Sequence, residues 1–260
     1  MIIGTRIRKF LRIIQVPAFR RALMHGVAAT VEHAGPLRGL SVASVLDIGA
    51  NNGQFALLAR HLWPAARISS FEPLADASAR FSSVLGNDPS VNLFNVALGV
   101  ERGEADFHVS RRADSSSMLA ITNRQTAMFP GTEEISMIKV PVDRLDALLT
   151  ANELRPPVLL KIDVQGFEIP VLEGSTGIID RVDHVYCECS FKELYQGQAL
   201  AHQVVRWLDD RGFALRGVYN LSYDGDGRAV QGDFLFERLI PAFQEERPFG
   251  HSSKSVPETV

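Results

Sequence analysis

Short apolar runs alternate with amphipathic stretches along most of the chain from residue 44 onward. Apolar runs are typical of buried strands, and apolar residues spaced three and four apart are typical of helices. Strands are predicted at residues 44–48, 67–71, 91–96, 158–162, 182–188, 213–218 and 234–238. Helices are predicted at residues 54–62, 75–85, 144–149, 167–172 and 200–210. This alternation predicts a doubly wound, Rossmann-like α/β fold with a mostly parallel sheet.

A segment at about residues 100–140 interrupts this rhythm. Two predicted strands, 103–109 and 136–140, flank a polar stretch that contains Ser115, Ser116 and Ser117. We interpret the segment as an insertion with a mobile loop, because long irregular segments in compact domains commonly serve in binding or as lids.

The first 40 residues form a basic extension that is predicted to be helical. Apolar residues such as Ile3, Ile7, Phe10 and Ile14 recur at helical spacing, and Pro17 breaks the pattern. The extension holds seven basic residues and one acidic residue, a net charge of +6 in a chain whose total is −3. Such a helix packs on a domain core or lies on anionic lipid headgroups.

Composition and charge narrow the classes of function that the chain can have. The charge of −3 argues against a nucleic-acid-binding surface over the whole molecule. Cys187 and Cys189, the only cysteines, are too close in sequence for a structural disulfide loop and predict reduced thiols in a cytoplasmic protein. Four ligands for a zinc site are lacking. Residues 41–240 therefore form the expected main domain, and residues 241–260, rich in Pro, Ser and charge, are expected to be disordered.

The sequence VLDIGANNG carries the first chemical signal. Asp47 ends an apolar run, and a turn from Gly49 to Gly53 precedes a predicted helix. Glycines let a ligand approach the backbone, and the first turn of a helix presents free N–H groups. A dinucleotide site shares these features, but the spacing departs from G-x-G-x-x-G, and a carboxylate at position 47 would repel a pyrophosphate and attract an ammonium group.

Glu72 carries the second signal. It ends the next predicted strand, where a carboxylate can accept both hydroxyls of a ribose. Asn95-Val96-Ala97-Leu98 closes the third strand, where it is placed to flank an adenine ring, and an ordinary strand exit fits this spacing equally well. An acid at a strand end is weak evidence by itself, but in register with the motif at Asp47 it is a strong signal of a ligand site.

In order, DIGANNG, FEP, NVALG and LLKIDVQGFEIPVLEG resemble the FkbM family of class I methyltransferases, from about Val42 to Phe236. The resemblance implies a seven-stranded sheet with an antiparallel last strand. It also implies S-adenosylmethionine as cofactor and methyl transfer to a hydroxyl of a sugar, glycolipid or polyketide-type small molecule. The implied cofactor-binding residues are Asp47, Gly49, Asn51 and Gly53 for the methionine part, Glu72 for the ribose, Ala97 for the adenine and Asp163 beside the sulfonium.

The acid at the end of the fourth parallel strand, Asp163, is the first candidate for catalysis. There it can hold the acceptor hydroxyl, stabilise the donor or take a proton. Glu188, an acid in an apolar run, is the second candidate. Glu168 is the third, although its place in a first helical turn also fits a structural role. Gln165 stands where the family commonly has an acid in D-x-E-G-x-E. The histidines at 108, 184 and 202 remain open as bases.

A magnesium-assisted mechanism would use Asp163 with Glu188 or Glu168 as ligands, although the spacing does not require a metal. Two other functions stay open. A nicotinamide-dependent oxidoreductase would share the sheet, but no tyrosine is followed four residues later by lysine. A catalytically silent binding module would share the fold.

The absence of N-P-P-[FY] after the fourth strand disfavours DNA and amine acceptors. A small-molecule or glycolipid acceptor is expected, with membrane contact through the basic helix. The sequence leaves the acceptor and the oligomeric state open.

Overall fold

The computed structural model describes residues 2–239. The predicted disordered tail, residues 241–260, lies outside the described residues. Within the described range, no helix is long and apolar enough to cross a membrane.

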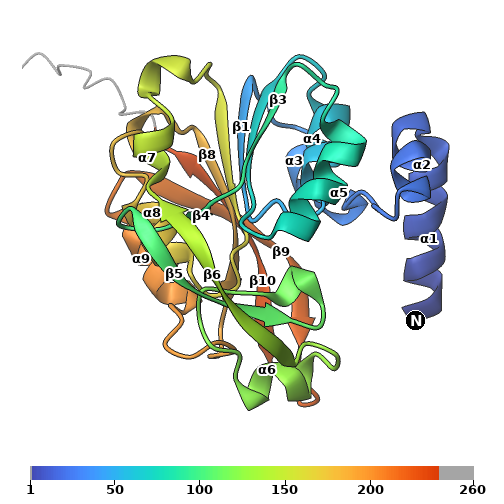
Figure 1. Ribbon diagram of the computed structural model, residues 1–260, viewed down its shortest axis with the longest axis vertical. Coiled ribbons are helices and arrows are strands. Elements are labelled where there is room, and N and C mark those ends of the chain that lie inside the picture. Colours follow the sequence, from blue (N-terminus) through green and yellow to red (C-terminus); the bar gives the residue numbers. More distant parts are fainter. Residues whose placement is uncertain (1, 240–260) are drawn as a thin grey trace, which may run out of the picture.

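Seven strands form the main sheet, in the order β3-β2-β1-β7-β8-β10-β9 (Figure 1). The strands are β1 (Ser44–Ile48), β2 (Arg67–Phe71), β3 (Val91–Phe94), β7 (Val158–Ile162), β8 (His184–Ser190), β9 (Phe213–Tyr223) and β10 (Ala229–Arg238). The first five pair in parallel, and β10 runs antiparallel between β8 and β9. The predicted seven-stranded, mostly parallel sheet with an antiparallel last strand is confirmed.

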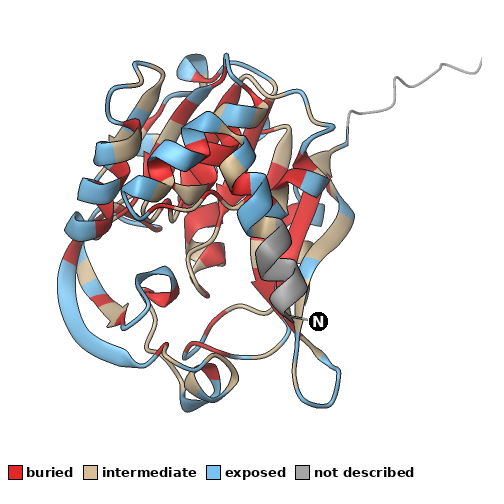
Figure 2. Cartoon of the chain, turned by 90° about the vertical axis from the view of Figure 1, so that its right-hand side faces the viewer, coloured by how far each residue is buried: buried red, intermediate tan, exposed pale blue. Residues whose placement is uncertain are grey.

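Helices cover both faces of this sheet. Every residue of β1 and β7 is buried, and side chains alternate between the two faces. Val45 and Leu159 pack with α4 (Gln54–Leu62) and α5 (Ala75–Leu85) on one face. Leu46 and Leu160 pack on the other face with α7 (Leu145–Leu148), α8 (Glu168–Glu173) and α9 (Ala201–Asp209). Figure 2 shows the buried strands between the more exposed helices. Short helical turns complete the connections: η1 (Val31–His33), α3 (Ala34–Leu37), η3 (Ala151–Glu153) and η4 (Ile179–Arg181).

The basic extension forms α1 (Ile2–Gln15) and α2 (Pro17–Met24), which break at the predicted proline. Ile13, Phe19 and Ala22 are buried in the cluster that includes α4. The ring of Phe19 meets His61 edge-on, with 5.1 Å between centroids. The extension is therefore packed on the core through one face.

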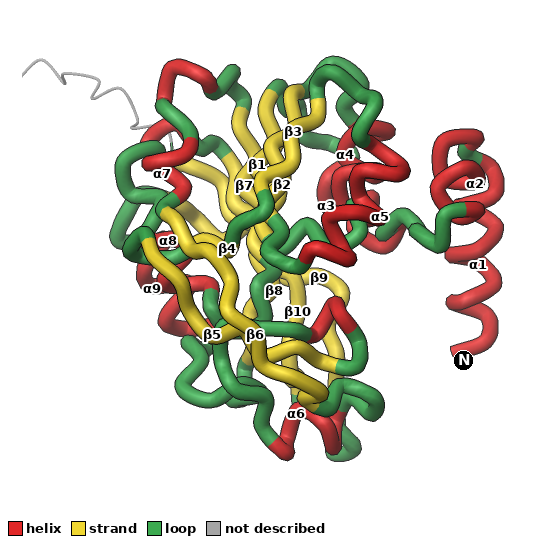
Figure 3. Tube along the Cα trace, viewed as in Figure 1, coloured by secondary structure: helices red, strands yellow, loops and turns green. Residues whose placement is uncertain are grey.

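A second, three-stranded sheet lies between β3 and β7 in sequence and beside the main sheet in space (Figure 3). Its order is β4 (Ala97–Leu98), β6 (Glu134–Asp143) and β5 (Gly103–Ser110), and η2 (Ala113–Ser115) and α6 (Asn123–Met128) connect β5 to β6. The three serines of the predicted mobile loop are buried. The Oγ of Ser117 donates a hydrogen bond of 2.7 Å to the carbonyl of Gln165, so this part of the insertion is packed against the turn after β7.

Strands β9 and β10 are longer than predicted. The loop that joins them spans residues 224–228, whereas the sequence predicted a loop over residues 219–233. The added part carries polar residues, among them Asn220, Ser222, Gln231 and Asp233, which line a cavity. A strand whose side chains face a polar cavity has no apolar run to reveal it.

Candidate active site

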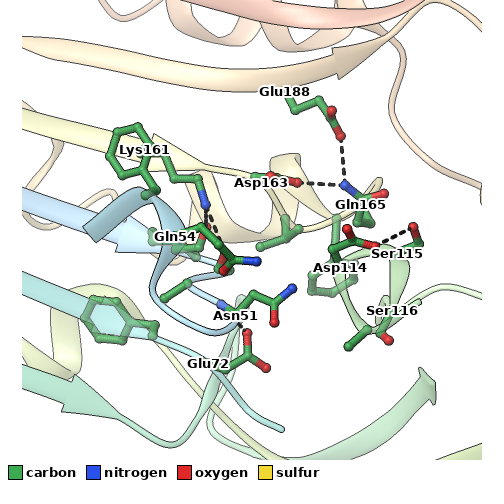
Figure 4. A pocket seen from close by; sticks show the side chains of 18 of the residues that line it. Asn51, Gln54, Glu72, Asp114, Ser115, Ser116, Lys161, Asp163, Gln165 and Glu188 are labelled. Atoms are coloured by element: carbon green, nitrogen blue, oxygen red, sulfur yellow. Dashed lines mark hydrogen bonds between the residues drawn. The ribbon is translucent and has the colours of Figure 1, made fainter. Parts of the chain in front are cut away.

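A cavity of about 400 Å³ opens at the carboxyl ends of the parallel strands (Figure 4). Gly49, Glu72, Asp163 and Glu188 line it from the ends of β1, β2, β7 and β8. The insertion, strands β9 and β10 and the segment 30–33 supply further walls. Ligands in open α/β sheets bind at this edge, and the volume is within the range of small-molecule sites.

The turn after β1 is shaped by close backbone contact. Gly49 has φ +73, and a Cβ atom there would lie 1.9 Å from the carbonyl oxygen of Asp163. Asn51, with φ 47, follows it along the cavity wall. Gly53 does not line the cavity. With φ +86, it begins α4, and a Cβ there would meet the Phe81 ring at 2.9 Å. Gly53 therefore shapes the turn through packing.

Glu72 is the carboxylate at the end of β2, and it is only 5% exposed. Its oxygens accept hydrogen bonds of 2.8 Å from the backbone N–H groups of Asn51 and Leu74. Burial raises the pKa of Glu72 to about 7 in spite of these donors. Ala97 also lines this part of the cavity. The two residues therefore lie where the sequence predicted them.

Asp47 lies beneath the site, which corrects the expectation that it faces a ligand. It is completely buried and does not line the cavity. Its Oδ1 lies 3.1 Å from the Nζ of Lys161 on β7, the residue opposite it in the sheet. No other group in residues 9–239 hydrogen-bonds to the Asp47 carboxylate. The Lys161 Nζ also donates to the carbonyls of Gly49 at 2.9 Å and Ile48 at 3.2 Å.

Sequence reasoning missed Lys161, although a lysine inside the apolar run LLKI is itself a signal of a buried charge with a partner. Burial opposes the charge of Lys161, but the carboxylates of Asp47 and Asp163 outweigh it and raise the pKa of the amine. Lys161 lines the cavity. The site therefore contains a fixed positive charge beside the β1 turn.

Asp163 and Glu188 are brought together through Gln165 (Figure 4). The Gln165 Nε2 donates to Asp163 Oδ1 at 2.7 Å and to Glu188 Oε2 at 2.8 Å. The hydroxyl of Tyr195 donates to Gln165 Oε1 at 2.7 Å, which fixes the orientation of the amide. Burial raises the pKa of Asp163 and raises that of Glu188 well above its ordinary value. The side-chain amide therefore stands between the two carboxylates that the sequence suggested as magnesium ligands.

Among the described residues, no group of three or more His, Cys, Asp or Glu side chains is arranged to hold a metal ion. Glu168, the third catalytic candidate and a further suggested ligand, is buried outside the cavity lining. Its Oε1 accepts a hydrogen bond of 2.8 Å from the N–H of Gly166. Burial raises the pKa of Glu168 to about 7. The structure thus gives Glu168 a role at the start of α8 and does not place it at the reaction site.

The cavity wall beyond Glu188 was not predicted. Glu188 Oε1 accepts a hydrogen bond of 3.0 Å from Gln231 Nε2 on β10. Asn220 and Asp233 lie on the same wall, and His33 reaches it from η1. The histidines left open by the sequence do not line the cavity: His108, His184 and His202.

Comparison with known proteins gives a consistent picture. A family model described as the methyltransferase FkbM domain matches residues 47–215. The 2-O-methyltransferase NoeI of Sinorhizobium fredii is 29% identical over 227 residues, which cover 85% of this chain and 90% of NoeI. The AMB antimetabolite synthetase AmbE of Pseudomonas aeruginosa is 30% identical over 160 residues, 51% of this chain but 8% of AmbE.

Among solved structures, the magnesium protoporphyrin IX methyltransferase ChlM from Synechocystis PCC 6803 shows 9% identity and a TM-score of 0.41. That similarity covers 89% of this chain and 83% of ChlM.

We predict that Lys161→Met lowers the free energy of unfolding by about 3–5 kcal/mol, because Asp47 is left buried without its counter-ion. The double variant D47N/K161M should recover part of this loss, since it removes the unpaired charge. Urea unfolding of the three proteins measures both effects.

Lys139→Met is the matched control, because this strand lysine pairs with Asp106 at the surface. It should change stability by less than about 1 kcal/mol. A K161M protein as stable as the K139M protein would show that the Asp47–Lys161 pair contributes nothing.

Proposed function

The chain belongs to the FkbM family of S-adenosylmethionine-dependent methyltransferases, and from that premise we propose that it methylates a hydroxyl oxygen of a sugar, glycolipid or polyketide-type small molecule. The nicotinamide-dependent oxidoreductase is thereby set aside. The observation that carries the proposal is the chemistry of the acceptor wall. Carboxylates and amides from Glu188, Gln231, Asn220 and Asp233 face the cavity together. Hydroxyl groups satisfy both kinds of partner, as donors to the acids and as acceptors from the amides.

The same wall argues against an anionic acceptor. A phosphate would approach three acids, Asp163, Glu188 and Asp233, and desolvation already raises the pKa of the first two, so a further negative charge there is costly. The relative NoeI, named as a 2-O-methyltransferase, agrees with transfer to oxygen.

On the donor side, the residues fit a nucleoside with a positive charge. The β1 turn presents backbone N–H groups at the start of α4, Glu72 accepts the ribose hydroxyls, and Ala97 flanks the adenine. Bound S-adenosylmethionine supplies an electrophilic methyl group. Asp47 acts indirectly in this proposal, because Lys161 links it to the Gly49 carbonyl.

On the acceptor side, Asp163 and Glu188 hold the reacting hydroxyl near the methyl group. Their spacing is fixed by Gln165, so the acceptor oxygen meets a pre-organised pair. Much of the rate of such a displacement comes from holding the reacting atoms in line and near contact distance. Burial raises the pKa of Glu188 well above its ordinary value, which favours its protonated form as a donor to the acceptor.

We propose a second contact, between the α1–α2 extension and an anionic membrane surface. Phe10, Leu11 and Met24 are 53%, 46% and 79% exposed, although each is apolar. Arg12 and Arg20 are exposed on the same two helices. Apolar side chains inserted at the headgroup level, with arginines beside acidic headgroups, are the means by which a basic helix binds a bilayer surface. Such a contact would suit a lipid-linked acceptor.

We predict that the affinity for S-adenosylmethionine falls about tenfold between pH 8 and pH 6. The pKa of Glu72 is about 7, raised from 4.5, so the carboxylate that accepts both ribose hydroxyls is replaced below pH 7 by the neutral acid. Titration calorimetry at the two pH values measures the change.

Two variants test whether Glu72 causes this pH dependence of the affinity. Glu72→Gln should bind more weakly at both pH values and lose the pH dependence. Glu168→Gln should keep it, because Glu168 has the same pKa of about 7 but lies outside the cavity. Equal affinity of the wild type at pH 6 and pH 8 would remove Glu72 from the ribose contact.

We predict that the purified protein forms S-adenosylhomocysteine with hydroxyl acceptors from a panel of sugars, glycolipids and polyketides, and that mass spectrometry finds the methyl group on oxygen. Asp163→Asn should retain donor affinity and lower turnover by about 100-fold or more, because the acceptor oxygen loses its fixed partner.

Asp210→Asn, at an exposed position after α9, should behave as the wild type. Donor binding without any product would indicate a silent binding module. Methylation confined to amines would contradict the proposed acceptor class, and normal turnover of D163N would contradict the role of Asp163.

We predict that reversing three charges, in R12E/R20E/R21E, weakens binding to phosphatidylserine-containing vesicles by at least about 100-fold. Co-sedimentation measures this binding. The matched variant R67E/R80E/R181E makes the same change in charge at exposed positions on other elements. Its binding to the vesicles should differ much less from that of the wild type. Equal binding of the two variants would eliminate the membrane contact.

A further inference from the structure

Four polar side chains from η1, β8, β9 and β10 meet at the cavity, and all of them except Tyr186 line it. The Nδ1 of His33 lies 3.2 Å from Asp233 Oδ2 and 3.0 Å from the hydroxyl of Tyr186. The Nδ2 of Asn220 donates to the same Asp233 oxygen at 2.7 Å. His33, Asn220 and Asp233 lie outside residues 47–215, so the family match includes only Tyr186 of this cluster.

The local fold aims this cluster into the cavity. Asn220 has φ 47, and the β9–β10 pairing shifts register beside Asp233. Bulges of this kind redirect side chains and are common beside active sites. The His33 ring is held edge-on by Phe55 and Tyr186, with centroids 6.0 and 5.5 Å away. Its position is thus fixed from three elements.

Among the residues that the structure describes, all of the polar contacts of the His33 ring are made by Nδ1, with Asp233, Tyr186 and, at 3.3 Å, Asn220. Asp233 faces Nδ1, so the tautomer that places hydrogen on Nδ1 is stabilised, as in an Asp–His pair. Burial raises the pKa of Tyr186, so its hydroxyl stays protonated, and the hydroxyl oxygen can accept from the Nδ1–H. No hydrogen bond from residues 9–239 reaches the Nε2 of His33, and the residue lines the cavity. The Nε2 lone pair is therefore free to accept a proton.

The other groups of the cavity are less suited to that step. Burial raises the pKa of Glu188 well above its ordinary value, and its two oxygens already accept hydrogen bonds from Gln165 and Gln231. Asp163 has its Oδ1 hydrogen-bonded to Gln165. Burial raises the pKa of Asp163, and the charges of Asp233 and His33 also act on it, which places the cluster and the acceptor carboxylates in one electrostatic site.

We propose that His33, oriented by Asp233, is the general base that removes the proton from the acceptor hydroxyl. This assignment rests on the proposed function and deepens it. The acceptor oxygen forms the new O–C bond while the C–S bond breaks and its electron pair stays on sulfur. The hydroxyl proton moves to His33 Nε2, and the imidazolium is stabilised by the Asp233 carboxylate until the proton leaves to water.

The test is the turnover of His33→Ala on an acceptor that the wild type methylates. Without the base, kcat should fall about 100- to 1,000-fold while the affinity for S-adenosylmethionine, measured by calorimetry, is unchanged. Added imidazole should restore part of the activity of H33A, which a purely structural role of His33 would not allow. Asp233→Asn should lower kcat at least about tenfold with little change in KM.

His202→Ala is the matched control, because this histidine is exposed on α9 away from the cavity. It should keep wild-type kcat and show no response to imidazole. An H33A protein with wild-type kcat, or one that imidazole does not rescue, would overturn the assignment while leaving the methyltransfer to oxygen intact. A wild type that methylates no hydroxyl would overturn both the proposed function and this base.

Discussion

The buried ion pair between Asp47 and Lys161 is the constraint on which the site depends. The two residues face each other across the central strands β1 and β7, and Lys161 also binds the Gly49 carbonyl at the start of the turn. Burying two charges is costly, and the cost is offset only while their geometry holds. A one-residue slip of β7 would turn Lys161 to the other face and leave Asp47 alone. The pair thus fixes the register and, through it, the turn that faces the donor.

From this centre, charge is distributed unevenly across the cavity. The Lys161 amine stands beside the β1 turn, whereas Asp163 and Glu188 line the part of the cavity proposed for the acceptor. Gln165 separates the two carboxylates with an amide that is oriented by Tyr195. Burial then favours the protonated forms of these acids, so they meet the acceptor as hydrogen-bonding groups rather than as an anionic surface. A neutral, hydroxyl-rich acceptor suits such an environment.

The sequence predicted the parts of the fold whose signals are local. The bounds of β1, β2 and β7 match the predicted ranges because continuous apolar runs mark buried parallel strands. Glu72 and Asp163 were found because strand ends are recognisable. The partner of Asp47 was missed because register joins residues more than 100 positions apart, and His33 because its partner lies in β10. The proposed base is His33 rather than Asp163, the first candidate from the sequence. No spacing in the sequence reveals the cluster around His33.

Lys161 and His33 were missed for the same reason: their partners are distant in sequence. The same difference separates the proposed donor side of the cavity from the proposed acceptor wall. The residues of the donor side lie in one stretch, from Gly49 to Ala97, where each strand end follows the previous one in sequence. The acceptor wall is assembled from η1, β8, β9 and β10, which only tertiary packing brings together. Of these elements, η1 and β10 and most of β9 lie outside the stretch that the family model matches. Acceptor choice can therefore change through β9, β10 and the N-terminal segment while the donor geometry, held by the Asp47–Lys161 pair, remains as it is.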